Sequence, residues 1–181
     1  MTATPTYRSL RRCAWLRLTL LLLAATPLLS ACVGGYSFTG ASIPAEAKTL
    51  SLKPFPNYAT TVNPQLSQKL YDAMHNLYES QTRLNVTNND GDLQVSGEIT
   101  SYSTQASSLS SDDNVATNRL TVTIKVKFVN LITPSDDFEQ SLTRYKDYDA
   151  TRDFSAVEGA LVEEIVTELS EDVFNKTVVN W

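Results

Sequence analysis

The chain has little of the chemistry on which most metal sites and many enzyme sites depend. Its 181 residues include only two cysteines, Cys13 and Cys32, and one histidine, His75. There is no His/Cys cluster with the spacing of a zinc site, and no Gly-x-Ser-x-Gly turn that would present a serine nucleophile. We therefore expect no metal, no cofactor and no catalytic residue. A carboxylate hydrolase of envelope glycans stays open, because it needs only two acids brought together by folding.

The start of the chain is built like an export signal. Four arginines lie within the first 17 residues, an apolar run covers 18–29, and Ser30 and Ala31 are small. A basic start, an apolar middle and small residues at the cleavage point are typical of a signal peptide. The run is shorter than the ~20 residues of a membrane span, which argues against a transmembrane anchor.

The residues Leu29-Ser30-Ala31-Cys32 resemble the lipobox of bacterial lipoproteins. The resemblance implies that residues 1–31 are removed and that the Cys32 thiol is acylated, a step that needs a sulfur nucleophile. Cleavage would also remove Cys13 and leave no cysteine for a disulfide. An ordinary secretory signal with an accidental Cys32 is the alternative.

The residue after Cys32 bears on the membrane to which the protein is sorted. In lipoproteins of the common sorting type, an acidic residue at this position signals retention in the inner membrane. Val33 is not acidic, so the resemblance implies the outer membrane, and we expect the protein on its periplasmic side.

The exported part is acidic. Four of the 15 basic residues and none of the 20 acidic residues precede Cys32, so residues 32–181 carry a formal net charge of −9. This charge disfavours nucleic acid as a partner, since nucleic-acid binding calls for a basic patch. The length of residues 32–181 suits one domain. We expect a lipidated tether and first edge segment over 32–44 and a single α+β domain over 45–181.

Alternating apolar residues predict the strands of this domain. The predicted strands cover 47–53, 83–87, 93–99, 120–128 and 138–148. The Ser-, Thr- and Asp-rich stretch 101–114 predicts a strand end that passes into a hairpin loop. Imperfect alternation over 138–148 predicts a β-bulge there.

Two stretches place apolar residues on one helical face, which predicts helices over 63–80 and 155–177. Asn63 is the expected cap of the first helix, and Ser155-x-x-Glu158 predicts a capping box for the second. His75 lies opposite the apolar stripe and should face solvent. Because each helix has one apolar face, we predict a two-layer α+β sandwich: a mainly antiparallel, meandering sheet of four to five strands with both helices on one face.

Several segments, in their order along the mature chain, resemble the LptE family of lipopolysaccharide-assembly lipoproteins. These are Cys32-x-x-Gly35-Tyr36-Ser37-Phe38-Thr39-Gly40, Leu50-Ser51-Leu52 with Phe55-Pro56-Asn57, Asn118–Val122, Asp137–Gln140, Asp172–Lys176 and Val179-Asn180-Trp181. The resemblance implies a non-enzymatic outer-membrane lipoprotein that binds and plugs the LptD β-barrel and assists assembly of lipopolysaccharide into the outer leaflet. An auxiliary lipoprotein of another envelope transport or secretion complex is the alternative.

The later strands carry most of the candidate contact residues. Basic residues that could meet lipid A phosphates are Arg119, Lys125, Lys127, Arg144, Lys146 and Arg152. The face of strand 120–128 that is opposite its apolar residues carries Thr121, Thr123, Lys125 and Lys127. We expect this face to meet water or a partner. Simple solvation of a half-exposed strand is the alternative. Tyr145 and Tyr148 are either interface aromatics or ordinary cross-strand pairs.

Overall fold

The computed structural model describes residues 43–61, 63–108 and 116–179, all within one compact unit, Ala41–Trp181. The predicted signal peptide, Cys32 and the tether as far as residue 42 lie outside the described residues. The elements of the described part are β1 (Thr49–Leu52), α2 (Leu66–Gln81), β2 (Asn85–Thr87), β3 (Leu93–Ser108), β4 (Thr117–Asn130), β5 (Phe138–Asp149) and α3 (Phe154–Phe174). Within this part of the chain, no helix combines the length and the apolar character that a membrane crossing requires.

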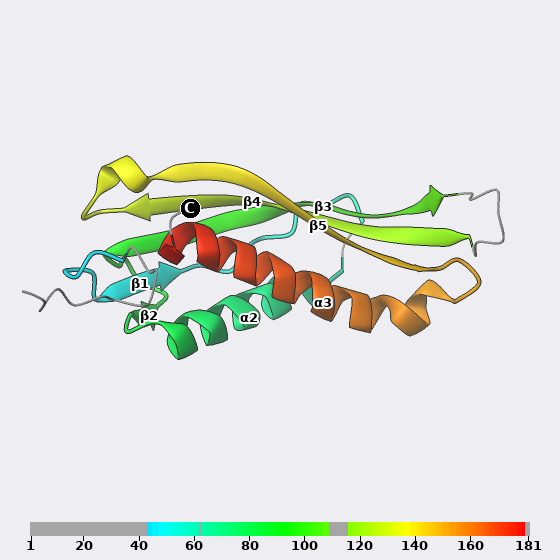
Figure 1. Ribbon diagram of the computed structural model, residues 1–181, viewed down its shortest axis with the longest axis horizontal. Coiled ribbons are helices and arrows are strands. Elements are labelled where there is room, and N and C mark those ends of the chain that lie inside the picture. Colours follow the sequence, from blue (N-terminus) through cyan, green and yellow to red (C-terminus); the bar gives the residue numbers. More distant parts are fainter. Residues whose placement is uncertain (1–42, 62, 109–115, 180–181) are drawn as a thin grey trace, which may run out of the picture. The chain divides into compact units, whose positions relative to one another are not determined.

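The fold is the predicted two-layer α+β sandwich. The strands form one sheet in the order β2-β1-β3-β4-β5, and α2 and α3 lie together on one of its faces (Figure 1). Between the layers, Leu66, Leu70 and Met74 of α2 and Ile165 and Leu169 of α3 are fully or almost fully buried. Burial of each such side chain contributes about 1.5–3 kcal/mol, so packing between the layers is the main source of stability.

The sheet is mixed, and the expectation of a meander holds only for its second half. β3, β4 and β5 follow one another as antiparallel neighbours. β1 is parallel to both β2 and β3 and lies between them. The reason is that α2 separates β1 from β2 and returns the chain to the same end of the sheet, as in a βαβ unit.

The link from β2 to β3 crosses over β1 on the face opposite the helices. Leu50 and Leu52 of β1 are in the core, so Ser51 points to the other face, and yet Ser51 is fully buried. Residues 88–92 cover it: a Cβ added at Gly91 would lie 2.8 Å from the Ser51 backbone nitrogen. A glycine is therefore needed at the crossing, because any side chain would push the link off β1.

Two details of the strands differ from the prediction. β3 continues as a strand to Ser108 instead of becoming a loop after Ser101. β5 pairs with β4 without any register shift, and the bulges lie in β3, at Ile99/Ser101 and Ala106/Ser108. The alternation along β5 is imperfect for another reason: two basic residues on its helix side pair with carboxylates of α3.

The predicted capping box of α3 is wrong. The N-cap is Asp153, whose side chain accepts a hydrogen bond from the Ser155 backbone nitrogen at 3.1 Å. Glu158 does not reach back to the helix start. One of its carboxylate oxygens accepts hydrogen bonds from the Tyr102 hydroxyl at 2.5 Å and from the Asn63 amide at 2.8 Å. Glu158 therefore joins α3 to β3 and to the chain before α2.

The other helix ends lie close to the predicted positions, but the predicted cap of α2 is wrong. The N-cap is Gln65, which makes no side-chain capping hydrogen bond, and the Asn63 side-chain oxygen accepts a hydrogen bond from the Gln65 nitrogen at 2.9 Å, before the helix begins. The α-helical hydrogen bonding of α3 stops at Phe174, and the predicted last turn is a π-helical turn, Asn175–Val179. His75 is only partly exposed, and its Nδ1 atom lies 3.6 Å from a carboxylate oxygen of Glu79.

Candidate functional site

The face of the sheet that points away from the helices is the candidate functional site; we call it the outer face. The strand register sets its side chains in rows across β3, β4 and β5. One row contains Glu98, Lys125 and Ser141, and the next contains Ser96, Lys127 and Glu139. The outer face comprises Ser96, Glu98, Ser101, Ser103, Gln105, Thr117, Arg119, Thr121, Thr123, Lys125, Lys127, Glu139, Ser141, Thr143, Tyr145, Asp147 and Asp149.

One group of charges lies at the end of the outer face nearest the β4–β5 turn. The Lys125 ammonium pairs with the Glu139 carboxylate and lies opposite Glu98 in the register. The hydrogen bond from Lys125 lowers the pKa of Glu139, and the same bond raises the pKa of Lys125. Both residues therefore carry their full charge at neutral pH. The Lys127 side chain makes no ion pair within the described part of the chain.

A second group of charges lies at the other end. The Arg119 guanidinium donates two hydrogen bonds to the Asp147 carboxylate, at 2.7 and 2.9 Å. It also lies 3.8 Å from the centre of the Tyr145 ring. The bond to Arg119 lowers the pKa of Asp147. This arrangement holds Arg119 flat against the sheet, with a carboxylate and an aromatic face as partners.

Hydroxyl groups occupy the space between the two charged ends. Thr123 and Thr143 face each other across β4 and β5, with their hydroxyl oxygens 3.0 Å apart. Ser101 and Ser103 continue this band on β3. A hydroxyl both donates and accepts hydrogen bonds, so the middle of the outer face can bind polar groups of either kind without a charge.

A shallow depression of about 280 Å³ opens on the outer face. Its lining is Ser96, Gly97, Glu98, Lys125, Lys127 and Glu139. Two carboxylates and two ammonium groups therefore surround it. Two carboxylates in one depression are also what a pair of catalytic acids would require. A general acid needs a raised pKa, and the pKa of Glu139 is lowered by Lys125. Glu139 is therefore not suited to be the general acid of such a pair.

The structure divides the predicted basic residues between two faces. Arg119, Lys125 and Lys127 lie on the outer face, but Arg144 and Lys146 point to the helix side of β5. Arg152 follows β5 in an exposed position. The basic residues of these strands therefore do not share one face, because neighbouring residues of a strand alternate between faces.

Carboxylates of α3 hold the two basic residues on the helix side. Arg144 donates two hydrogen bonds to Asp172, both at 2.6 Å. The Lys146 ammonium lies 2.7 Å from Glu168 and 3.1 Å from Glu164. The hydrogen bonds from these carboxylates raise the pKa values of Arg144 and Lys146. Neither cation is free to meet an anionic ligand without losing its partners.

The acidic residues of the outer face were not predicted from the sequence. Glu98, Glu139, Asp147 and Asp149 lie there beside the three basic residues. The signal that could have found them is cross-strand register, which places opposite charges beside one another in a sheet. The two tyrosines also separate: Tyr145 stacks with Arg119 on the outer face, whereas Tyr148 packs against Phe154 with ring centres 5.6 Å apart.

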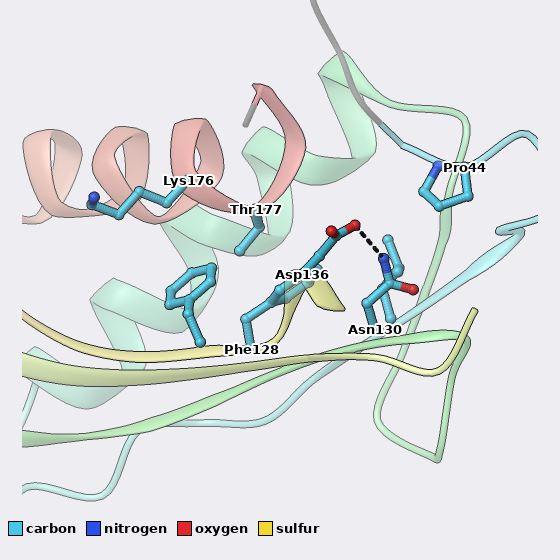
Figure 2. A pocket seen from close by; sticks show the side chains of 8 residues that line it. Pro44, Phe128, Asn130, Asp136, Lys176 and Thr177 are labelled. Atoms are coloured by element: carbon cyan, nitrogen blue, oxygen red, sulfur yellow. Dashed lines mark hydrogen bonds between the residues drawn. The ribbon is translucent and has the colours of Figure 1, made fainter. Parts of the chain in front are cut away.

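A smaller pocket lies beside the end of α3. Its lining includes Pro44, Phe128, Asn130, Asp136 and Thr177 (Figure 2), and its volume is about 30 Å³. The Asn130 amide donates a hydrogen bond to Asp136 at 3.3 Å, and Figure 2 shows the Lys176 amine directed away from both. The pocket has room for about one water molecule. Asn130 in its lining stabilises the β4–β5 turn, since its side-chain oxygen accepts hydrogen bonds from the Ile132 and Thr133 nitrogens. Across the described ranges, no group of three or more His, Cys, Asp or Glu side chains is placed to hold a metal ion.

Several solved structures are similar to this chain. A protein from Xanthomonas campestris is 12% identical with a TM-score of 0.52, over 75% of this chain and 86% of that one. A hypothetical protein from Chlamydia trachomatis is 9% identical with a TM-score of 0.50, over 72% and 98%. The rare lipoprotein B from Shewanella oneidensis is 15% identical with a TM-score of 0.48, over 71% and 92%. At these identities the first two support the fold alone.

Sequence similarity shows the family to which the chain belongs. No curated protein matches the chain. The model of the LptE family, described as lipopolysaccharide-assembly, matches residues 47–177. The match begins just before β1 and ends within the π-helical turn after α3, so it includes both helices, the whole sheet and the outer face. This chain belongs to the LptE family of lipopolysaccharide-assembly proteins.

Proposed function

We propose that this protein is a non-enzymatic lipoprotein of the outer membrane that assists assembly of lipopolysaccharide into the outer leaflet. Residues 1–31 are a signal peptide that is removed, and acyl chains on Cys32 anchor the protein at the periplasmic side. Residues 32–44 form a tether, and 45–181 form the domain that binds and plugs a β-barrel of the LptD type. The observation that carries the proposal is the family match over residues 47–177.

The chemistry of the outer face supports contact with a barrel interior. Its three basic and four acidic residues nearly balance one another, whereas residues 32–181 as a whole carry a formal net charge of −9. The interior of a large β-barrel is polar. A nearly neutral surface of charges and hydroxyls can exchange its bound water for polar groups of such a wall. A strongly charged or apolar face would bind such a wall less favourably, because charged or polar groups would be buried without partners.

The pairing of Glu139 also supports a role in binding. In the outer-face depression, Lys125 pairs with Glu139 and lowers the pKa of its carboxyl. Glycoside hydrolysis by two carboxylates requires one of them to stay protonated near neutral pH. We therefore assign these residues to partner binding.

The test compares two Thr→Arg substitutions that add the same charge. Thr123→Arg places a bulky cation in the hydroxyl band of the outer face, and Thr167→Arg places one on exposed α3. After mild crosslinking and detergent extraction, we expect the barrel to co-purify with wild type and Thr167→Arg, and far less with Thr123→Arg. Equal recovery with both variants would reject the outer face as the contact. Recovery of inner-membrane transporter subunits without a barrel would support the alternative complex instead.

The anchor is tested separately with Cys32→Ala. This variant has no thiol to acylate, so we expect it to leave the membrane fraction once the barrel complex has been dissociated. Two or more acyl chains are needed for stable anchoring, at about 0.8 kcal/mol per buried methylene. A Cys32→Ala protein that stays with membranes after dissociation would contradict lipid anchoring.

A further inference from the structure

β5 forms one edge of the sheet and pairs with β4 on one side only. It runs for 12 residues, whereas β2 at the opposite edge has 3. Its register with β4 is unbroken from Phe138 to Asp149, and it contains no proline. Proteins usually blunt a long edge strand with proline, a bulge or charge, since its free backbone groups invite another strand.

The phase of hydrogen bonding shows which backbone groups of β5 are free. Ala150 donates to the carbonyl of Ala116 at 2.9 Å, directly beyond the Thr117–Asp149 pair. In an antiparallel ladder, hydrogen-bonded pairs alternate with non-bonded pairs. Even-numbered residues of β5 therefore bond to β4, and the N–H and C=O groups of odd-numbered residues point to the free edge. These are Glu139, Ser141, Thr143, Tyr145 and Asp147, and among the described residues no backbone hydrogen bond satisfies them.

The helix side of this edge carries excess negative charge. Arg144 and Lys146 of β5 project toward α3, where Asp172, Glu168 and Glu164 partner them. Glu171 adds a fourth carboxylate close enough to act on the pKa of Arg144. Inward charges on an edge strand deter pairing when they are uncompensated. Here the carboxylates more than neutralise them, so a neighbouring strand with basic side chains on its helix side would be attracted.

We propose that the free edge of β5 is a second docking surface, which takes an extended strand of a partner protein with basic residues at alternate positions. The main-chain ladder supplies affinity in such strand addition, and the alternate side chains supply specificity. This surface is distinct from the outer face, because its hydrogen-bonding groups lie in the plane of the sheet.

The test uses the mature full chain and a short synthetic peptide of alternating lysine and threonine, with a glutamate-for-lysine peptide as control. Amide hydrogen exchange is followed by NMR. In the free protein, we expect fast exchange at Ser141, Thr143 and Tyr145 and slow exchange at Leu142 and Arg144. The lysine peptide should slow the three edge amides at least about tenfold, and the glutamate peptide should have little effect.

Variants separate the edge from the rest of the fold. Thr143→Pro removes an outward N–H without touching a bond to β4, and it should weaken peptide binding at least about tenfold. Thr143→Ala keeps that N–H and should bind as wild type does. Should Thr143→Pro fail to fold, Glu171→Lys tests the charge alone: it should weaken binding of the lysine peptide and strengthen that of the glutamate peptide.

Three results would overturn the proposal. One is slow exchange at the edge amides in the free protein, which would mean that the chain covers its own edge. The others are no protection by the lysine peptide, or equal protection by both peptides. Thr123→Arg on the outer face should leave peptide binding unchanged, so a failure of the proposed function and a failure of this inference can be told apart.

Discussion

The hydroxyl oxygens of Tyr78 and Thr177 lie 2.5 Å apart in the core, where they join α2 to the π-helical turn after α3. The Thr177 hydroxyl also lies within hydrogen-bond distance of the Val173 and Phe174 carbonyls, at 2.9 and 3.1 Å. Because Thr177 has one hydroxyl proton and a carbonyl can only accept, Tyr78 is the donor to Thr177. Burial raises the pKa of Tyr78, so this donor keeps its proton throughout the physiological range.

This chain of hydrogen bonds predicts unequal effects of removing its two ends. Thr177→Val leaves the Tyr78 hydroxyl buried without an acceptor, which should lower the free energy of unfolding by ~1–3 kcal/mol. Tyr78→Phe removes the donor and leaves Thr177 bonded to a carbonyl, which should cost about 1 kcal/mol. Urea unfolding measures both. The double variant should lose less than the sum, since the two hydroxyls act as one unit.

The control for this pair is Tyr71→Phe. The Tyr71 hydroxyl donates to Asn88 at 2.9 Å in an exposed position, where water can replace the lost partner. Its free energy of unfolding should change by less than about 0.5 kcal/mol. A loss as large as that of Thr177→Val would show that burial is not what makes the core pair important.

Two Gly→Ala substitutions should have opposite effects on stability. A Cβ at Gly97 would meet the Lys125 carbonyl oxygen and lie 2.5 Å from a ring atom of Phe55, whereas one at Gly159 meets nothing within 4 Å. Gly97→Ala should therefore destabilise the domain by ~1–3 kcal/mol through overpacking. Gly159→Ala, in exposed α3, should stabilise it by up to ~1 kcal/mol. Thermal unfolding of both variants checks the signs, and a stabilising Gly97→Ala would contradict the tight packing of Phe55 on β3.

Periodicity alone was enough to predict the layers of this fold. The apolar residues of α2 and α3 recur at helical spacing, and those of β4 alternate along the strand, so the buried face of each element could be read before the structure. The position of β1 between β2 and β3 could not, because it depends on the crossing at Gly91, a contact between distant parts of the chain. The capping box failed because Asp153 competes with Ser155 for the same role.

The candidate site was only half predictable for a related reason. Composition indicated basic residues in the last strands, but Lys125 and Lys146 point to opposite faces because the register of β4 with β5 places them there. The acidic partners of the outer face lie on two different strands, β3 and β5. Their pairing appears only once the sheet is assembled.

Asp92 predicts a specific acid sensitivity. Its carboxylate accepts hydrogen bonds from the backbone nitrogens of Lys48 and Thr49, at 2.9 and 3.0 Å, and from the Thr49 hydroxyl at 2.8 Å. The bond from Lys48 is the largest cause of its lowered pKa. A lowered pKa stabilises the folded state above the unfolded value of about 4, and this stabilisation disappears as the pH falls through the folded pKa.

The measurement compares urea midpoints of wild type and Asp92→Asn across pH. The variant should be less stable at neutral pH, and the difference should shrink as the pH falls below about 4. Asp90→Asn is the matched control, since Asp90 is exposed in the same link and accepts no hydrogen bond from the described residues. A gap between wild type and Asp92→Asn that stays constant with pH would contradict the linkage.

The division of the basic residues between two faces predicts which of them contribute to anion binding. Lys127 faces outward without an ion pair to a described residue, whereas Lys146 is held by Glu164 and Glu168. Near an anionic surface, one basic residue contributes about 1 kcal/mol. Lys127→Ala should therefore weaken binding to lipopolysaccharide micelles about fivefold at low salt, and Lys146→Ala by less than about twofold. The Lys127 effect should diminish as added salt shortens the screening length below ~10 Å. Equal losses from both substitutions would mean that the α3 carboxylates release Lys146 on binding, and that the face on which a lysine lies does not decide its contribution.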